Sequence, residues 1–330
     1  MAANLTQQYL KAAEEYRRAQ NASEELRCLE VMLRELPKHK ASEKLESELK
    51  QKISRAKKDV QTERSSGKRG PSFRIPRQGA GTVVLLGGPN AGKSSLLSHL
   101  TRAQAEVAEY PFTTQKPLPG MMAWEDVTVQ LIDTPPITAD FFESSLHGLI
   151  RGAESAVLLV DLGSDDGVEQ LQELLDRLAE TKTRLAAKSF LDEDDIGLSY
   201  TQTILAPNKI DLPDASQRLE LLRELCPLDF PEFPISITSG EGIEKLRQAI
   251  YEGLNVVRVY SKLPTAKEPD MKRPFTVRRG GTLMDVAAQV HKDFVKSFKF
   301  ARVWGSEVHD GTIVKSDYVV QDKDIVELHR

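Results

Sequence analysis

Hydrophobic residues recur every three or four positions through the first 64 residues, which is the period of amphipathic α-helices. The three stripes are Leu5, Tyr9, Ala13, Tyr16 and Ala19; Leu26, Leu29, Leu33 and Leu36; and Leu45, Leu49, Ile53, Ala56 and Val60. Pro37 should end the second helix, because proline has no amide hydrogen for a helical hydrogen bond. Residues 1–64 are therefore predicted to form a helical hairpin or small bundle.

The pattern changes to alternating strands and helices from Thr82 onward. Continuous apolar runs such as TVVLL, VTVQLI, AVLLVDL, TILAP and FPISI are separated by amphipathic helical segments such as VEQLQELLDRLAE. This alternation is typical of a parallel sheet covered by helices on both faces. Residues 82–259 are therefore predicted to form an α/β domain, preceded by a basic linker at 65–81.

The last part of the chain has a smaller repeat of strand and helix patterns. After an expected linker at 260–272, a strand is predicted from Pro274 to Val277, a turn at Gly280 and Gly281, and a helix from Leu283 to Phe294. KFARVW and DIVELH are predicted to be further strands. Residues 273–330 should form a small independent domain.

Charge divides the chain unevenly. Residues 1–80 contain 18 Lys and Arg against 11 Asp and Glu, whereas residues 81–330 contain 27 against 38. The basic part is either a polyanion-binding arm, with nucleic acid as the first candidate, or a solvated helical surface. No apolar run reaches the length of a membrane span, and only two cysteines occur, so a cytoplasmic protein without a disulfide framework is expected.

The stretch GGPNAGKS, residues 87–94, matches the phosphate-binding loop pattern G-x-x-x-x-G-K-[ST]. It lies between a buried strand and a helix, where backbone amides can surround phosphate groups. Lys93 is expected to contact the β- and γ-phosphates, and Ser94 to bind Mg²⁺. The predicted phosphate contacts are Asn90, Ala91, Gly92, Lys93, Ser94 and Ser95.

Asn208-Lys209-Ile210-Asp211 follows a predicted strand and indicates the base. The Asp211 carboxylate can accept the N1–H and 2-amino hydrogens of guanine, a donor pair that adenine lacks. Asn208 is expected to brace the phosphate loop, and the stem of Lys209 to pack on the base. Ser236 and Ile237, after the next strand, are expected to add backbone contacts. GTP and GDP are thus favoured over ATP, and a P-loop kinase or ATPase is the less favoured reading.

Two further segments are expected to sense the γ-phosphate. In YPFTT, Thr114 is predicted to bind Mg²⁺ and release it after hydrolysis. Asp133 of the sequence DTPP is predicted to hold Mg²⁺, through water. Many nucleotide switches have glycine where this chain has Pro136, and proline cannot donate an amide hydrogen bond to the phosphate. Ile137 stands where a glutamine often orients the attacking water, and an isoleucine cannot do so.

These motifs, GGPNAGKSS, EYPFTT, the DTP of DTPP and NKID, resemble those of the Obg–HflX group of GTPases, and most of all the developmentally regulated GTP-binding (DRG) proteins. FTVRRGGTLMDVAAQVHKDF and the strands after it look like a TGS domain, a β-grasp module. The resemblance covers nearly the whole chain. It implies a P-loop GTPase with an N-terminal helical region and a C-terminal TGS domain.

The resemblance also implies a role in translation. Such proteins are associated with ribosomes, so a ribosome or structured RNA is the expected partner, bound through the basic arm and the TGS domain, and a protein regulator is a further candidate. Related GTPases use an asparagine at the position of Asn90 to bind K⁺, which implies slow, K⁺-stimulated hydrolysis with Lys93 balancing transition-state charge. No residue is assigned as a catalytic base. Pro136 and Ile137 support an alternative, a guanine-nucleotide-binding scaffold that does not hydrolyse GTP.

Overall fold

The computed structural model describes residues 5–17, 19, 22–37, 42–66, 75–101, 116–138, 145–181, 183–191 and 198–330. The larger of the two β-sheets has the strand order β2-β3-β1-β4-β7-β5, and β6 also pairs with β7. The strands are β1 (Thr82–Gly87), β2 (Leu118–Trp124), β3 (Val127–Asp133), β4 (Ser155–Asp161), β5 (Thr183–Ala186), β6 (Phe190–Leu191) and β7 (Ser199–Asn208). β3, β1, β4, β7 and β5 are parallel, whereas β2 and β6 are antiparallel to their neighbours.

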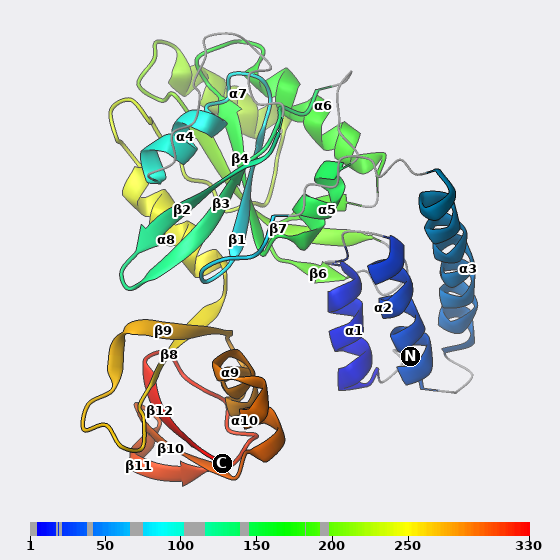
Figure 1. The fold of residues 1–330 in the computed structure, drawn as a ribbon. Helices are drawn as coiled ribbons and strands as arrows, with labels where there is room; N and C mark the ends of the chain where they lie inside the picture. Colours follow the sequence, from blue (N-terminus) through cyan, green and yellow to red (C-terminus); the bar gives the residue numbers. More distant parts are fainter. Residues whose placement is uncertain are drawn as a thin grey trace.

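Helices cover both faces of this sheet (Figure 1). α5 (Ser145–Gly152), α6 (Gly167–Ala179) and α7 (Ala215–Leu225) pack on one face, and α4 (Lys93–Leu100) and α8 (Ile243–Gly253) on the other. Successive residues of β1 alternate between the two cores, Val84 and Leu86 on the first face and Val83 and Leu85 on the second. Because both sides are buried, the strand is apolar throughout, and the predicted two-sided α/β domain is confirmed.

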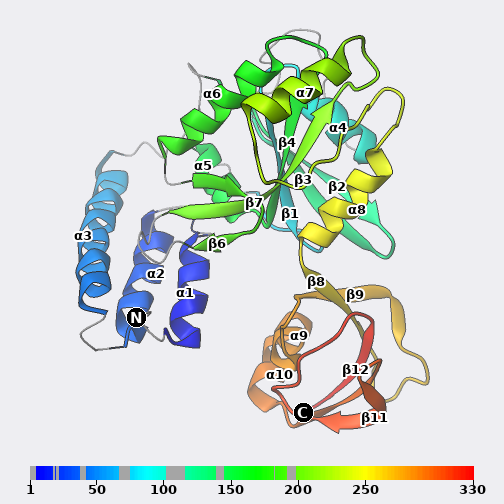
Figure 2. The same ribbon diagram turned by 180° about the vertical axis from the view of Figure 1, so that it is seen from behind.

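The N-terminal stripes form a three-helix unit of their own. α1 (Gln7–Arg17), α2 (Ala22–Glu35) and α3 (Glu43–Ser66) bury Tyr9, Leu29, Met32, Leu49 and Ile53 in a common core. α2 ends two residues before Pro37, as expected from the missing amide hydrogen. Figure 2 shows this bundle beside the β6 end of the large sheet. The predicted helical N-terminal region is therefore confirmed.

A second sheet, in the order β11-β10-β12-β8-β9, forms the C-terminal domain. Its strands are β8 (Val256–Ser261), β9 (Asp270–Arg278), β10 (Phe300–Gly305), β11 (Val308–Val314) and β12 (Asp324–His329), and its helices are α9 (Leu283–Val290) and α10 (Lys292–Ser297). Thr282 and Asp285 form a reciprocal capping box at the start of α9. The small core includes Val259, Leu283, Val286, Val303 and Val326. The β-grasp domain is thus present.

Two expected boundaries differ from the structure. β8 pairs with β9 and β12, so residues 256–261 belong to the second sheet rather than to the end of the α/β domain and the linker 260–272. The local sequence NVVRVY does not predict this assignment, because the parallel neighbour of β8 is β12, which lies far along the chain. The strand expected at Phe233–Ile237 is only two isolated bridges with β7, at Leu205 and Asn208. Leu205 donates to Pro231, and Phe233 and Ile235 donate to β7, but Pro207 of β7 has no amide hydrogen for the bond between them.

The expected linker at 65–81 is also only partly a linker. Ser65 and Ser66 extend α3, residues 67–74 lie outside the described part of the chain, and residues 75–81 lie against the large sheet. Gly79 bridges to Val129, and Arg77 pairs with Glu154 at 2.9 Å. Across the described segments, every helix is too short or too polar to cross a membrane.

Candidate nucleotide site

The predicted phosphate-binding loop joins the central strand β1 to α4. Its backbone turns through left-handed conformations at Asn90 (φ 56°) and Gly92 (φ 98°). A Cβ atom at Gly92 would stand 2.3 Å from the side-chain nitrogen of Asn208, and one at Gly88 would stand 2.3 Å from Gln170. Gly92 requires glycine because its backbone is left-handed and the Asn208 amide lies against it, whereas a side chain at Gly88 would require the Gln170 side chain to move.

Lys93 lies inside this loop, with its side chain almost fully buried. Its ammonium group donates hydrogen bonds to the carbonyl oxygens of Gly87 at 3.0 Å and Gly88 at 2.8 Å. Burial lowers the pKa of Lys93 to about 8, although the nearby Asp133 carboxylate acts in the opposite direction. A phosphate group would supply the negative charge that favours the protonated lysine.

Ser94 and Asp133 come together at the end of this loop. The Ser94 hydroxyl donates to Oδ2 of Asp133 at 2.5 Å, and Asp133 is only 1% exposed. The next residue, Thr134, fixes the end of β3 by donating to the carbonyl of Leu85 at 2.7 Å. A hydroxyl and a carboxylate are the oxygen donors that Mg²⁺ prefers, so this pair fits the expected metal site. The predicted third ligand, Thr114, lies outside the described residues.

The predicted base-recognition segment reaches the phosphate loop from the end of β7. The Asn208 side-chain amide donates to the Ala91 carbonyl at 3.0 Å, which is the bracing contact that was expected. Ile237 also lies near Gly92, and Ser236 is fully buried and accepts the amide of Ser239 at 3.0 Å. Asp211 is exposed, where a bound base can reach it. Segments far apart in sequence therefore converge on one site.

The DTPP segment is packed into the protein interior. Pro136 is buried, and Ile137 is 0% exposed within the core that also contains Leu146, Ile150 and Leu162. Ile137 therefore anchors the segment to the sheet, rather than standing where it could face an attacking water.

Asp161 is a further residue of this site that the sequence reasoning missed. It lies at the end of β4, is 6% exposed, and accepts a hydrogen bond from the Lys209 ammonium at 2.5 Å. The sequence does indicate this residue by its position, since AVLLVD places an acidic residue at the carboxyl end of a buried strand. In the structure this strand is adjacent to the strand that ends in Asn208.

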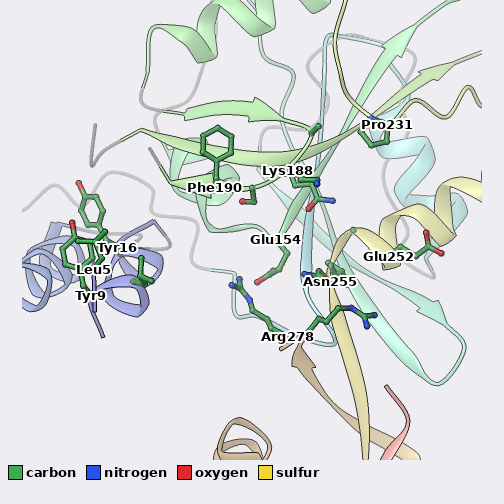
Figure 3. A pocket seen from close by; sticks show the side chains of 18 of the residues that line it. Leu5, Tyr9, Tyr16, Glu154, Lys188, Phe190, Pro231, Glu252, Asn255 and Arg278 are labelled. Carbon is green, nitrogen blue, oxygen red and sulfur yellow. The ribbon is translucent and has the colours of Figure 1, made fainter. Parts of the chain in front are cut away.

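A cleft of about 1020 Å³ lies apart from these loops. Figure 3 shows its walls, with Tyr9 and Tyr16 of α1 on one side, and Lys188, Phe190 and Arg278 contributed by the β5–β6 segment and β9. Phe190 is half exposed and stacks on Tyr200 with 4.0 Å between ring centroids. The cleft is formed where the three structural units meet, and it includes none of the predicted nucleotide contacts.

The fold and this site define a P-loop nucleotide-binding domain joined to a β-grasp domain. Residues 82–189 match the family described as "50S ribosome-binding GTPase", and residues 257–330 match the TGS domain. The chain thus combines a region that matches this GTPase family with a region that matches the TGS domain, and it is a GTP-binding protein similar to the developmentally regulated GTP-binding proteins.

Relatives extend over nearly the whole chain. An uncharacterized GTP-binding protein of Methanocaldococcus jannaschii is 29% identical over 92% of this chain and 91% of its own. The developmentally-regulated GTP-binding protein 2 homolog of Dictyostelium discoideum is 27% identical over 92% and 98%. Ribosome-interacting GTPase 1 of Saccharomyces cerevisiae is 26% identical over 92% and 97%. A crystal structure of a GTP-binding protein from Pyrococcus horikoshii aligns with 16% identity, 75% and 99% coverage, and a TM-score of 0.49.

Proposed function

We propose that this protein is a GTPase switch that binds GTP and GDP with Mg²⁺ and acts on ribosomes or structured RNA in the cytoplasm. The observation that carries the nucleotide part is the hydrogen bond between Asn208 and Ala91, which joins the guanine-specific segment to the phosphate loop. In this site Lys93 and the backbone of residues 90–95 bind the phosphates, Ser94 and Asp133 hold Mg²⁺, with Thr114 as the third ligand, and Asp211 pairs with guanine. Bound Mg²⁺ would offset charge on the β- and γ-phosphates.

A nucleotide panel tests the guanine assignment. GDP should bind far more tightly than ADP, because Asp211 would remain without its two donors against adenine. Asp211→Asn should weaken GDP binding and favour xanthosine diphosphate, since an amide can donate to the 2-oxo group that replaces the 2-amino group. Lys93→Ala should abolish binding of either nucleotide. Equal affinity of the wild type for ADP and GDP would contradict the proposed function.

Hydrolysis is proposed to be slow and stimulated by K⁺. Asn90 has a left-handed backbone in the phosphate loop, where its side-chain oxygen can serve as a cation ligand. The competing role is simply to brace this turn. Asn90→Gly separates the two roles, because glycine keeps the left-handed turn but removes the side-chain oxygen. We expect the variant to retain GDP affinity and lose the difference in GTP turnover between KCl and NaCl buffers. Equal turnover of the wild type in both buffers would exclude K⁺ stimulation.

A scaffold that binds guanine nucleotides without hydrolysis is the second candidate. Pro136 and Ile137 favour it, because these residue types supply neither the glycine amide nor the glutamine that other switches use. Both residues are also buried. Single-turnover measurement of GTP cleavage distinguishes the two functions. No cleavage above the buffer rate, with ribosomes present and in K⁺, would favour the scaffold.

The proposal that the protein binds ribosomes or RNA is supported by the distribution of charge along the chain and by the name of one related protein. Residues 257–330 contain 14 Lys and Arg against 10 Asp and Glu, and residues 1–80 are also basic, so two basic regions flank an acidic GTPase domain. The yeast relative is named a ribosome-interacting GTPase. Lys188 and Arg279 are exposed and line the cleft between the three units. Their basic side chains could contact phosphate groups of RNA, with a salt-dependent affinity.

Co-sedimentation with ribosomes tests this part. Lys188→Glu together with Arg279→Glu should reduce the bound fraction severalfold, and the loss should shrink as salt rises. Lys245→Glu together with Arg302→Glu is the matched control, because it makes the same change of net charge at exposed residues of α8 and β10 outside the cleft, and it should have a smaller effect. Equal losses from the two sets would mean that net charge alone, rather than this cleft, determines binding.

A further inference from the structure

Asp161 and Lys209 form an ion pair beside the predicted base site. Oδ2 of Asp161 accepts from the Lys209 ammonium at 2.5 Å, while Oδ1 accepts from the backbone amide of Gly163 at 2.7 Å. Both carboxylate oxygens are therefore engaged, and the Asp161 side chain is 6% exposed. The Lys209 side chain is 32% exposed, so its outer part still reaches solvent. The Asp161 carboxylate is therefore held in place by its surroundings, and it restrains the more exposed side chain of Lys209.

The surrounding loop follows the course of the lysine stem. A Cβ atom at Gly163 would stand 2.9 Å from Cδ of Lys209 and 2.7 Å from Cδ1 of Leu212, so glycine makes room for this packing. The backbone amide of Leu162 donates to the carbonyl of Asn208 at 3.0 Å, which ties the two loops together. Lys209 itself has a left-handed backbone (φ 67°), which a non-glycine residue adopts only when its surroundings hold it there.

We infer that Asp161 is a positioning residue for guanine recognition, acting through Lys209. This inference rests on the proposed function, because it assumes that the base packs against the Lys209 stem. A free lysine side chain samples many rotamers, and binding a base would have to restrict them. The ion pair with Asp161 fixes the ammonium end beforehand, so the stem already lies along the base site. Asp161 contributes to affinity in this way without touching the nucleotide.

The inference predicts a particular pattern of affinities. Asp161→Asn removes the negative charge that pairs with Lys209. Both GDP and GTP should then bind about 5–10-fold more weakly. This loss is at the lower end for a charge-assisted hydrogen bond, because Lys209 is partly exposed. The ratio of GTP to GDP affinity should not change, since the lysine acts at the base end of the nucleotide. Asp161→Glu keeps the charge and should recover part of the affinity.

A double-mutant cycle with fluorescent GDP and GTP analogues tests the inference. Asp161→Asn, Lys209→Met and the double variant are compared, with Asp165→Asn as the matched control. Asp165 is an exposed acid in the same loop that pairs with Arg218 at 2.7 Å, and its variant should bind like the wild type. If Asp161 acts through Lys209, the double variant binds no more weakly than Lys209→Met alone.

Three results would overturn the inference while leaving the proposed function intact. The first is an unchanged nucleotide affinity of Asp161→Asn. The second is that Asp161→Asn weakens binding by the same factor in the Lys209→Met background as in the wild type. The third is a change in the ratio of GTP to GDP affinity in Asp161→Asn. The second result would identify Asp161 as a structural residue, and a matching fall in the melting temperature without nucleotide would accompany it. Failure of the wild type itself to bind GDP would instead contradict the proposed function.

Discussion

Arg258 of β8 lies 3.0 Å from a carboxylate oxygen of Asp126, at the turn between β2 and β3. The same guanidinium contacts Glu125 and lies 2.9 Å from Asp322, and the Tyr260 hydroxyl donates to Asp126. These contacts hold the pKa of Asp126 and of Asp322 below the ordinary range, against the effect of burial. The TGS domain is thus ion-paired to the hairpin whose other end, at Asp133, belongs to the predicted Mg²⁺ site (Figure 1).

Replacing Arg258 by methionine should destabilise the protein. The arginine side chain is 6% exposed, and its loss would leave three carboxylates close together without their common cation. Because those carboxylates are partly exposed, we expect a cost of about 1–3 kcal/mol, below the range for fully buried pairs. Thermal unfolding measures the effect, and Arg302→Met, at an exposed arginine of the same sheet, is the control. Equal melting temperatures of the two variants would show that the ion-pair cluster contributes nothing.

Ile137→Gln should not create a faster GTPase. Sequence position places residue 137 where a glutamine could orient water, but the side chain is buried in the core with Leu146 and Ile150. A glutamine there would bury an amide without its hydrogen bonds, at a cost of about 1–3 kcal/mol. The expected result is a lower melting temperature and no gain in single-turnover GTP cleavage. The control is Ile313→Gln, which changes an isoleucine that is 61% exposed. Faster cleavage by Ile137→Gln would contradict the packing.

Pro136→Gly should increase the preference for GTP over GDP. The glycine would restore a backbone amide at the position from which other switches donate to the γ-phosphate, and a hydrogen bond to a charged group contributes about 1.5–3 kcal/mol. The measured quantity is the ratio of GTP to GDP affinity. Pro135→Gly adds the same backbone freedom and places the new amide one residue earlier, so it is the matched control. An unchanged ratio in Pro136→Gly, or the same rise in both variants, would refute this role.

The sequence predicted the parts of the fold that have strong local patterns. Continuous apolar strands such as AVLLVDL and the phosphate loop at residues 87–94 are recognisable because a buried parallel strand and a glycine-rich turn each require particular residue types. The pairing of β8 with β12 was not predictable, since Val259 and Asp324 become neighbours only through the topology of the domain. β11, which contains Gly311 and an exposed Ile313, carried too weak an alternation to be recognised.

In the candidate site, too, the residues that belong to local motifs could be predicted, and those that depend on strand pairing could not. Asn208, Lys93 and Ser94 could be named from motifs, and the structure places Asn208 against Ala91 and Ser94 against Asp133. The role of Asp161 depends on β4 and β7 being adjacent and in register, which pairs it with Asn208. No local pattern contains that register. The burial of Ile137 was likewise hidden, because an apolar residue after a proline pair can equally lie in a loop.

Nucleotide binding should take up a proton above pH 8. In the free protein burial lowers the pKa of Lys93 to about 8, so at pH 8.5 a large fraction of this lysine is neutral. Bound phosphates favour the ammonium form and raise its pKa again. Binding therefore protonates Lys93, and GDP affinity should fall as pH rises from 8 to 9.5. Calorimetric titration with GDP in two buffers of different ionisation enthalpy measures the proton uptake. At pH 6.5 Lys93 is already protonated, so the same lysine contributes no uptake there. If uptake at pH 8.5 did not exceed the value at pH 6.5, the lowered pKa would be contradicted.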